Sequence, residues 1–140
     1  MSTQPPDVPV MPSPMRDSAP RRILVADDSE DMRVLLTEVL ESQGYEVVAV
    51  GSGGSALSEM TSRRPDLVIT DLLMPGMTGF SLRSQMLSRP ELAEIPVIVL
   101  SAYWHRPSET LEVDEVITKP LSIDRLLESI IRLLDPGRVG

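Results

Sequence analysis

Residues 22–50 read RILVADDSEDMRVLLTEVLESQGYEVVAV, and this stretch predicts the class of fold. It opens with a continuous apolar run at 23–26 and closes with a mostly apolar run at 45–50, in which Glu46 is the one charged residue. Such runs are typical of strands that are buried on both faces of a parallel sheet. Between them, Ser29 is a good N-cap and Gly44 a good helix terminator. The stretch therefore predicts a strand–helix–strand unit.

The apolar residues of the predicted helix recur at helical spacing and predict one buried stripe. The members of that stripe are Met32, Leu35, Leu36, Val39 and Leu40. Farther along, apolar runs predict three more strands, and amphipathic or poorly defined helical segments separate them. The predicted strands are 67–69, 97–100 and 113–118, and the better-defined helices are 52–62, 79–88 and 122–134.

Five strands alternating with helical segments predict an α/β protein in which a parallel sheet is covered on both faces. We expect a doubly wound, five-stranded parallel sheet with the flavodoxin-like order 2-1-3-4-5. The chain of 140 residues has the size of one domain, and 41% of it is hydrophobic, which is enough for a core. Aromatic residues make up only 3%, so that core must be aliphatic.

Composition excludes several classes of function. The chain has no cysteine, which excludes disulfides, zinc–thiolate sites and cysteine nucleophiles. A net charge of −8 argues against direct nucleic-acid binding, which needs clustered Lys and Arg. A domain without cysteine is suited to a reducing compartment, and we expect a cytoplasmic location. No stretch approaches the roughly 20 apolar residues that span a bilayer, so we expect no membrane segment.

The ends of the chain differ from its centre. Six of the thirteen prolines lie in the first twenty residues, without helical or strand periodicity and without the pattern of a secretory signal. We therefore expect a disordered tail at 1–21, one domain at 22–135, and a C-terminal tail or the start of a linker at 136–140. Whether the chain is complete or the first part of a longer one stays open.

Polar residues follow the predicted strands at the point where each strand ends. Asp27 and Asp28 end the first, Asp71 the third, Ser101 the fourth and Lys119 the fifth. In a doubly wound sheet, ligands bind outside the carboxyl ends of the strands, where the strand order reverses. In the order 2-1-3-4-5 this point lies between strands one and three. We therefore expect three carboxylates to converge there, beside a hydroxyl and an ammonium group.

Three neighbouring carboxylates repel one another, and a hard divalent cation relieves this repulsion. Mg²⁺ characteristically binds one or two carboxylates together with waters and phosphate oxygens. One carboxylate then remains able to attack phosphorus, while the ammonium of Lys119 and the hydroxyl of Ser101 stabilise the charge on the phosphoryl oxygens. Each strand end alone is a weak signal. Their joint placement predicts a phosphoryl-transfer site.

The same residues resemble the signature of the response regulator receiver domain. The match comprises the acidic pair Asp27-Asp28, the run DLLMPGMTG at 71–79, Ser101-Ala102 and Lys119-Pro120. It extends from about Arg22 to Leu134, which is nearly the whole chain outside the tails. Each piece alone is modest, whereas the ordered set is highly specific.

The resemblance implies a role for each of these residues. Asp71 is the implied phosphoacceptor, and Asp27, Asp28 and the main-chain carbonyl of Leu73 are implied to hold Mg²⁺ together with Asp71. Ser101 and Lys119 are implied to contact the phosphoryl group, and the Lys119-Pro120 bond to be cis. The implied function is a bacterial two-component switch. Its phosphoryl donor would be a histidine kinase or a phosphotransfer protein, and its output partner is unknown.

Two departures from the family pattern bear on the switch. The segment between Ser101 and Lys119 is several residues shorter than usual, which predicts a shortened fourth helix. Val116 occupies the position, three before Lys119, that is commonly aromatic. One hypothesis is that Tyr103 and Trp104 transmit the phosphorylation state instead. The alternative is that this aromatic pair only packs over the shortened helix.

Two other classes of function compete with the phosphorylated switch. A receiver-like interaction module that works without phosphorylation usually has a damaged pocket, and here each expected residue is present. A Mg²⁺-dependent phosphohydrolase would need a second acid two residues after the nucleophile, where this chain has Leu73. We therefore expect a phosphoacceptor with slow self-dephosphorylation rather than an ordinary enzyme.

Overall fold

The computed structural model describes residues 20–102 and 113–135. Its main sheet is built from five strands, and four helices pack around it in the described ranges. The strands are β1 (Arg22–Ala26), β2 (Glu46–Val50), β3 (Leu67–Asp71), β6 (Val97–Ser101) and β7 (Glu115–Thr118). The helices are α2 (Glu30–Ser42), α3 (Gly53–Ser62), α4 (Gly79–Leu87) and α5 (Ile123–Leu134).

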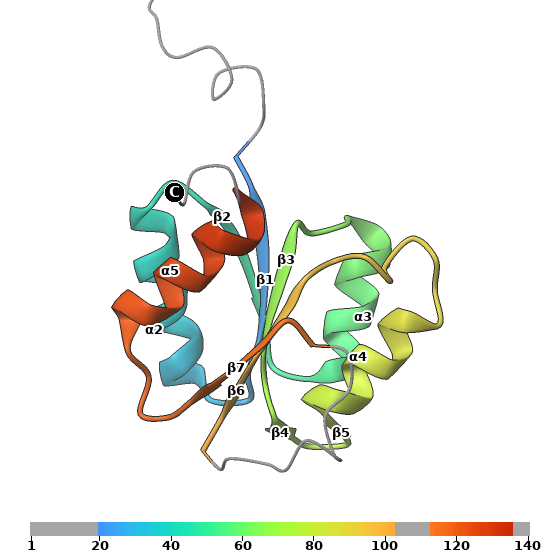
Figure 1. Cartoon of the computed structure of the whole chain (residues 1–140). Helices are drawn as coiled ribbons and strands as arrows, with labels where there is room; N and C mark the ends of the chain where they lie inside the picture. The colour runs from blue at the N-terminus through green and yellow to red at the C-terminus, as the bar shows by residue number, and fades with distance from the viewer. Residues whose placement is uncertain (1–19, 103–112, 136–140) are drawn as a thin grey trace, which may run out of the picture.

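The strand order confirms the predicted topology. The sheet runs β2-β1-β3-β6-β7, and all four neighbouring pairs are parallel. This is the order 2-1-3-4-5 once the two short strands β4 and β5, which lie outside the main sheet, are left out of the numbering. In Figure 1, α2 and α5 cover one face of the sheet, and α3 and α4 cover the other. The order reverses between β1 and β3, whose carboxyl ends therefore form the switch point.

Each face of the sheet has its own aliphatic core, because successive side chains of a strand point to opposite faces. Leu24 and Ala26 of β1 belong to the core under α3 and α4. Ile23 and Val25 belong to the core under α2 and α5. The apolar side chains of β1 are therefore buried on both faces of the sheet. This explains why the first strand reads as a continuous apolar run rather than as an alternating one.

Each described helix begins at a hydroxyl cap, among them Ser29, as predicted, and Ser122. These side chains accept the N–H of Met32 and Arg125. The predicted stripe of α2 needs one correction, however. Leu36 and Leu40 are fully buried, whereas Leu35 is 42% exposed. Neighbouring positions of a helix differ by about 100°, so a single sheet face buries only part of a five-residue stripe.

A short hairpin follows β3. Its strands are β4 (Leu73–Met74) and β5 (Met77–Thr78), which pair antiparallel. The connection is Pro75-Gly76, and Gly76 has a φ of +79°. Pro at the first and Gly at the second central position suit a type II turn, which needs positive φ at the glycine. Met74 is buried in the core, as expected for a packing residue.

Several predictions lie outside the described residues. They concern the N-terminal tail up to residue 19, the shortened fourth helix, the Tyr103-Trp104 pair, and residues 136–140. Within the described ranges, no helix has both the length and the apolarity needed to cross a membrane. Val116, which stands at the position that is commonly aromatic, is half-buried and packs against the core under α3 and α4.

Candidate functional site

Three carboxylates meet at the switch point. Asp27 and Asp28 follow directly after β1, and Asp71 is the last residue of β3. Because Ala26 is paired with Thr70 in the parallel register, the two acidic strand ends lie side by side. One carboxylate oxygen from each residue lies within 4.8 Å of the other two. The convergence predicted from the strand ends is therefore present in the fold.

Asp27 is held on three sides. Its N–H donates to Val50 O at 3.0 Å, and its carboxylate Oδ1 accepts the N–H of Ser29 at 2.9 Å. Its main-chain carbonyl accepts Arg33 Nη1 at 2.8 Å. The residue is 1% exposed, and its second carboxylate oxygen, Oδ2, has no hydrogen-bond partner in the described part of the chain. Burial of an unpaired charged oxygen costs free energy of folding, and a cation bound to this atom would offset that cost.

The electrostatics of Asp27 point the same way. Its pKa is raised above the ordinary value of 3.8, first because burial penalises the charged form. The N–H of Ser29 and the Lys119 ammonium lower this pKa, while the negative charges of Asp71 and Asp28 raise it. A bound divalent cation would compensate both the burial and the repulsion.

Lys119 pairs with Asp71. Its Nζ lies 3.1 Å from Asp71 Oδ1, and the two side chains are 27% and 13% exposed. Lys119 follows β7, and its N–H donates to the carbonyl of Ser101 at 2.7 Å. The Lys119-Pro120 bond is cis, as expected. The fold therefore brings a cation and an acid from two different strand ends into direct contact.

Ser101 and Leu73 lie at the edges of this cluster. Ser101 ends β6 beside Asp71, because β3 and β6 pair Asp71 with Leu100, and Ser101 is 1% exposed. Leu73 lies in β4, two residues after Asp71, and its side chain is 54% exposed. The roles predicted for the Ser101 hydroxyl and the Leu73 carbonyl remain predictions.

The hairpin after Asp71 closes tightly onto the strand that carries it. The N–H of Gly79, the first residue of α4, donates to Leu72 O at 2.7 Å. A Cβ at Gly79 would lie 2.8 Å from the main-chain oxygen of Asp71 and 3.2 Å from Thr70 Cγ2. Because the closest atom is backbone, it cannot rotate away. Only glycine allows α4 to start this close to the phosphoacceptor candidate.

We therefore expect Gly79→Ala to lower the free energy of unfolding by about 2 kcal/mol, in the range of other overpacking substitutions. Urea denaturation measures this change. Gly54→Ala is the matched control, because Gly54 lies in the first turn of α3 and a Cβ there would meet nothing within 4 Å. Alanine is the better helix former, so this control should be neutral or slightly stabilising. Equal losses in both variants would contradict the steric argument.

The sequence did not single out Arg33, and it included Gly79 only as the last residue of the run at 71–79, without a role of its own. Arg33 contributes through a bond to a main-chain carbonyl, and Gly79 through the absence of a side chain. Neither contribution has a residue pattern of its own. A partial signal exists for Arg33, since it lies one turn after the cap Ser29, on the helix that follows the acidic pair.

Comparison with known proteins places this chain in a family. The family model described as the response regulator receiver domain matches residues 23–131. The chain is 32% identical over 120 residues to protein PilH of Pseudomonas aeruginosa, which covers 81% of this chain and 97% of PilH. It is 35% identical over 134 residues to the sensor histidine kinase TmoS of Ectopseudomonas mendocina, which covers 91% of this chain but only 13% of TmoS.

A solved structure agrees with these relatives. The response regulator protein TrrA from Thermotoga maritima, in complex with Mg²⁺-BeF, matches with a TM-score of 0.74 at 35% identity, over 81% of this chain and 99% of that chain. The family model covers most of the chain, and the match to PilH spans nearly all of that protein. The chain therefore belongs to the response regulator receiver domain family of two-component signalling.

Proposed function

We propose that this chain is a phosphorylation-activated switch that accepts a phosphoryl group on Asp71 and changes its binding to an output partner. The observation that carries the proposal is the cluster at the switch point, where three carboxylates converge and Lys119 contacts Asp71. Membership of the receiver family supports the same assignment. We propose a histidine kinase or a histidine phosphotransfer protein as the donor.

We propose Mg²⁺ as the cation, held by Asp27, Asp28, Asp71 and the main-chain carbonyl of Leu73. When bound, this ion neutralises charge on the phosphoryl oxygens during transfer. Asp27 supports this assignment because its Oδ2 is buried and without a hydrogen-bond partner in the described residues. The crystal structure of TrrA in complex with Mg²⁺-BeF supports it by analogy.

In the transfer itself, a carboxylate oxygen of Asp71 forms a new bond to phosphorus. The bond between phosphorus and the donor atom breaks, and the donor nitrogen of a phosphohistidine keeps the electron pair. Asp71 then carries an acyl phosphate. Lys119, already 3.1 Å from Asp71 Oδ1, stabilises the added charge on a phosphoryl oxygen, and the Ser101 hydroxyl donates to another.

We also propose residues 22–135 as the receiver unit. β1 begins at Arg22 and α5 ends at Leu134, which supports these bounds. Arg21, the last residue of the predicted tail, already contacts the fold: it forms an ion pair of 3.1 Å with Asp135, and its carbonyl accepts the N–H of Glu46 at 2.9 Å. The chain matches nearly all of PilH but only 13% of TmoS, so receivers of this kind occur in chains of very different length.

The proposal is tested by intact mass after incubation with MgCl₂ and acetyl phosphate. We expect the mass to increase by one phosphoryl group, no increase when EDTA replaces Mg²⁺, and loss of the added mass with neutral hydroxylamine, which cleaves acyl phosphates. No increase despite a measured affinity for Mg²⁺ would overturn the proposal. It would favour the interaction module that works without phosphorylation.

The lifetime of the phosphoryl group gives a further prediction. Leu73 lies two residues after Asp71 and presents an apolar, 54% exposed side chain that cannot orient a water molecule. We expect self-dephosphorylation over minutes or longer and a severalfold faster loss in Leu73→Asn, measured by intact mass against time. Leu35→Asn is the matched control, because Leu35 is also an exposed leucine but lies on α2. Loss within seconds in the native chain would contradict this prediction.

A further inference from the structure

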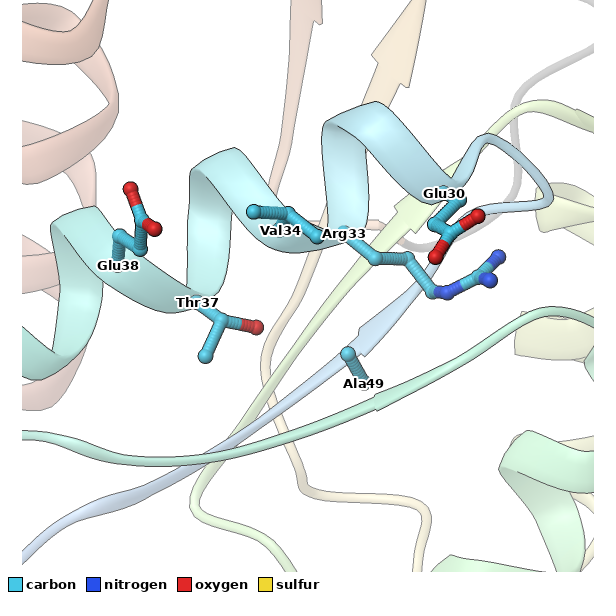
Figure 2. Close-up of a pocket in the computed structure, with 6 residues that line it drawn as sticks. All are labelled: Glu30, Arg33, Val34, Thr37, Glu38 and Ala49. Atoms are coloured by element: carbon cyan, nitrogen blue, oxygen red, sulfur yellow. The ribbon is translucent and has the colours of Figure 1, made fainter.

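Arg33 connects the acidic site to a groove under α2. Figure 2 shows its side chain extending from α2 along this groove toward the N-terminal end of the helix. The groove is lined by Glu30, Arg33, Val34, Thr37, Glu38 and Ala49. Arg33 is half-buried, although an arginine one turn into a surface helix could extend fully into solvent. Its guanidinium therefore has a defined position.

That position is defined by the carbonyl of Asp27, which accepts Arg33 Nη1 at 2.8 Å. The carbonyl lies one residue beyond Ala26, the last residue of β1 that is in register with β2 and β3. A main-chain carbonyl at the buried end of a sheet needs a donor. A guanidinium supplies a rigid, planar and permanently charged one. Arg33 thus supplies a hydrogen-bond donor for the main-chain carbonyl of Asp27, just beyond the end of β1.

The guanidinium also lies close to Gly51, in the loop after β2. A Cβ at Gly51 would lie 3.1 Å from Arg33 Nη1 and 3.7 Å from Arg33 Cζ. Nη1 is the same atom that donates to Asp27. The absence of a side chain at Gly51 therefore leaves room for the guanidinium in its bonded position. Arg33 Nη1 therefore lies beside both the loop after β2 and the acidic loop after β1.

We propose that Arg33 is a positioning residue for the cation site: its bond to the Asp27 carbonyl fixes the loop that carries the Asp27 and Asp28 carboxylates. The inference rests on the proposed function, because it concerns the affinity of the same site for Mg²⁺. Arg33 contacts the main chain of Asp27, and its contribution is geometric. Its charge acts in the opposite sense, since a nearby cation repels Mg²⁺.

This opposition makes the sign of the effect diagnostic. If Arg33 positions the loop, Arg33→Ala weakens Mg²⁺ binding by about tenfold, as is typical when a residue that orients a metal ligand is lost. If only its charge mattered, the same variant would bind Mg²⁺ more tightly. Calorimetric titration with MgCl₂ measures the dissociation constant without requiring phosphorylation. Arg64→Ala is the matched control, because Arg64 also donates to a main-chain carbonyl, that of Glu91 at 3.0 Å, away from the site.

Gly51→Ala supplies a second, independent variant that keeps Arg33. Its methyl group should displace Nη1 from the Asp27 carbonyl and weaken Mg²⁺ binding, though less than Arg33→Ala does. In the Arg33→Ala background the same glycine substitution should have no further effect, because the atom it displaces is gone. This coupling in the double-mutant cycle is specific to the proposed contact. A general loss of stability would add in both backgrounds.

Phosphoryl uptake gives a third readout. For Arg33→Ala, the Mg²⁺ concentration for half-maximal uptake from acetyl phosphate should rise by the same factor as the dissociation constant. The rate at saturating Mg²⁺ should change little, because Arg33 touches neither Asp71 nor Lys119 in the structure. Unchanged or tighter Mg²⁺ binding in Arg33→Ala, with uptake by the native chain intact, would overturn this inference alone. Absence of Mg²⁺ binding and uptake in the native chain would instead overturn the proposed function.

Discussion

Asp71→Asn should abolish phosphoryl uptake: incubation with Mg²⁺ and acetyl phosphate adds one phosphoryl group to the native chain and none to the variant. The carboxylate oxygen of Asp71 is the attacking atom, whereas an amide oxygen is far too weak a nucleophile to displace the donor. The replacement keeps the shape of the side chain, and the amide oxygen can still accept Lys119 Nζ, now 3.1 Å from Asp71 Oδ1. The fold should therefore survive while the chemistry is lost.

The matched control is Asp124→Asn, which changes the net charge equally at an exposed position in the first turn of α5. This variant should take up phosphoryl groups like the native chain. Intact mass spectrometry with peptide mapping measures both variants. Equal uptake in Asp71→Asn would show that another residue is the acceptor, and would contradict the role proposed for Asp71.

Asp27→Asn should have two large effects of opposite direction. First, it should weaken Mg²⁺ binding by more than the roughly 10–100-fold that follows loss of a residue that merely orients a ligand, because Asp27 is proposed as a ligand itself. Second, it should raise the stability of the Mg²⁺-free protein at pH 7 by about 1 kcal/mol, or several degrees in Tm. The native Asp27 carboxylate is buried, with Oδ2 unpartnered among the described residues. The amide removes that charge.

The stability gain should depend on pH. The pKa of Asp27 is raised in the folded state, mainly by burial. Below the ordinary value of 3.8, Asp27 is protonated in both the folded and unfolded chains, so its titration contributes no difference. As pH rises, the unfolded chain loses its proton first, and the native protein loses stability until the pH exceeds the raised pKa. The advantage of Asp27→Asn should therefore grow through this window and then stay constant.

Saturating Mg²⁺ should reverse the order of stability. Only the native chain gains the stabilisation that accompanies tight binding to the folded state. Thermal unfolding between pH 3 and 8, with EDTA or with MgCl₂, measures both effects, and Asp124→Asn again controls for the change in net charge. If the variant were less stable than the native chain in EDTA at pH 7, this would contradict the argument that the buried, charged carboxylate of Asp27 destabilises the Mg²⁺-free fold.

By itself, the sequence determined the topology and which residues meet at the site. Apolar runs identified strands buried on both faces, and their alternation with helices predicted the observed sheet order. Because parallel strands carry their carboxyl ends to one edge, the acids that end the first and third strands had to converge. Lys119 at the end of the fifth strand was placed near Asp71 by the same reasoning, and the structure gives 3.1 Å.

Tertiary structure decided how these residues are held. It determined that Leu35 is exposed although its spacing matches the buried stripe, because the sheet covers only part of that face of α2. It also placed Arg33 Nη1 between the Asp27 carbonyl and Gly51, and the start of α4 against the Asp71 carbonyl at Gly79. These contacts involve main-chain atoms or depend on the small size of glycine, so the pattern of side chains in the sequence does not predict them. For the same reason, only the folded structure shows which carboxylate oxygen of Asp27 has no hydrogen-bond partner among the described residues.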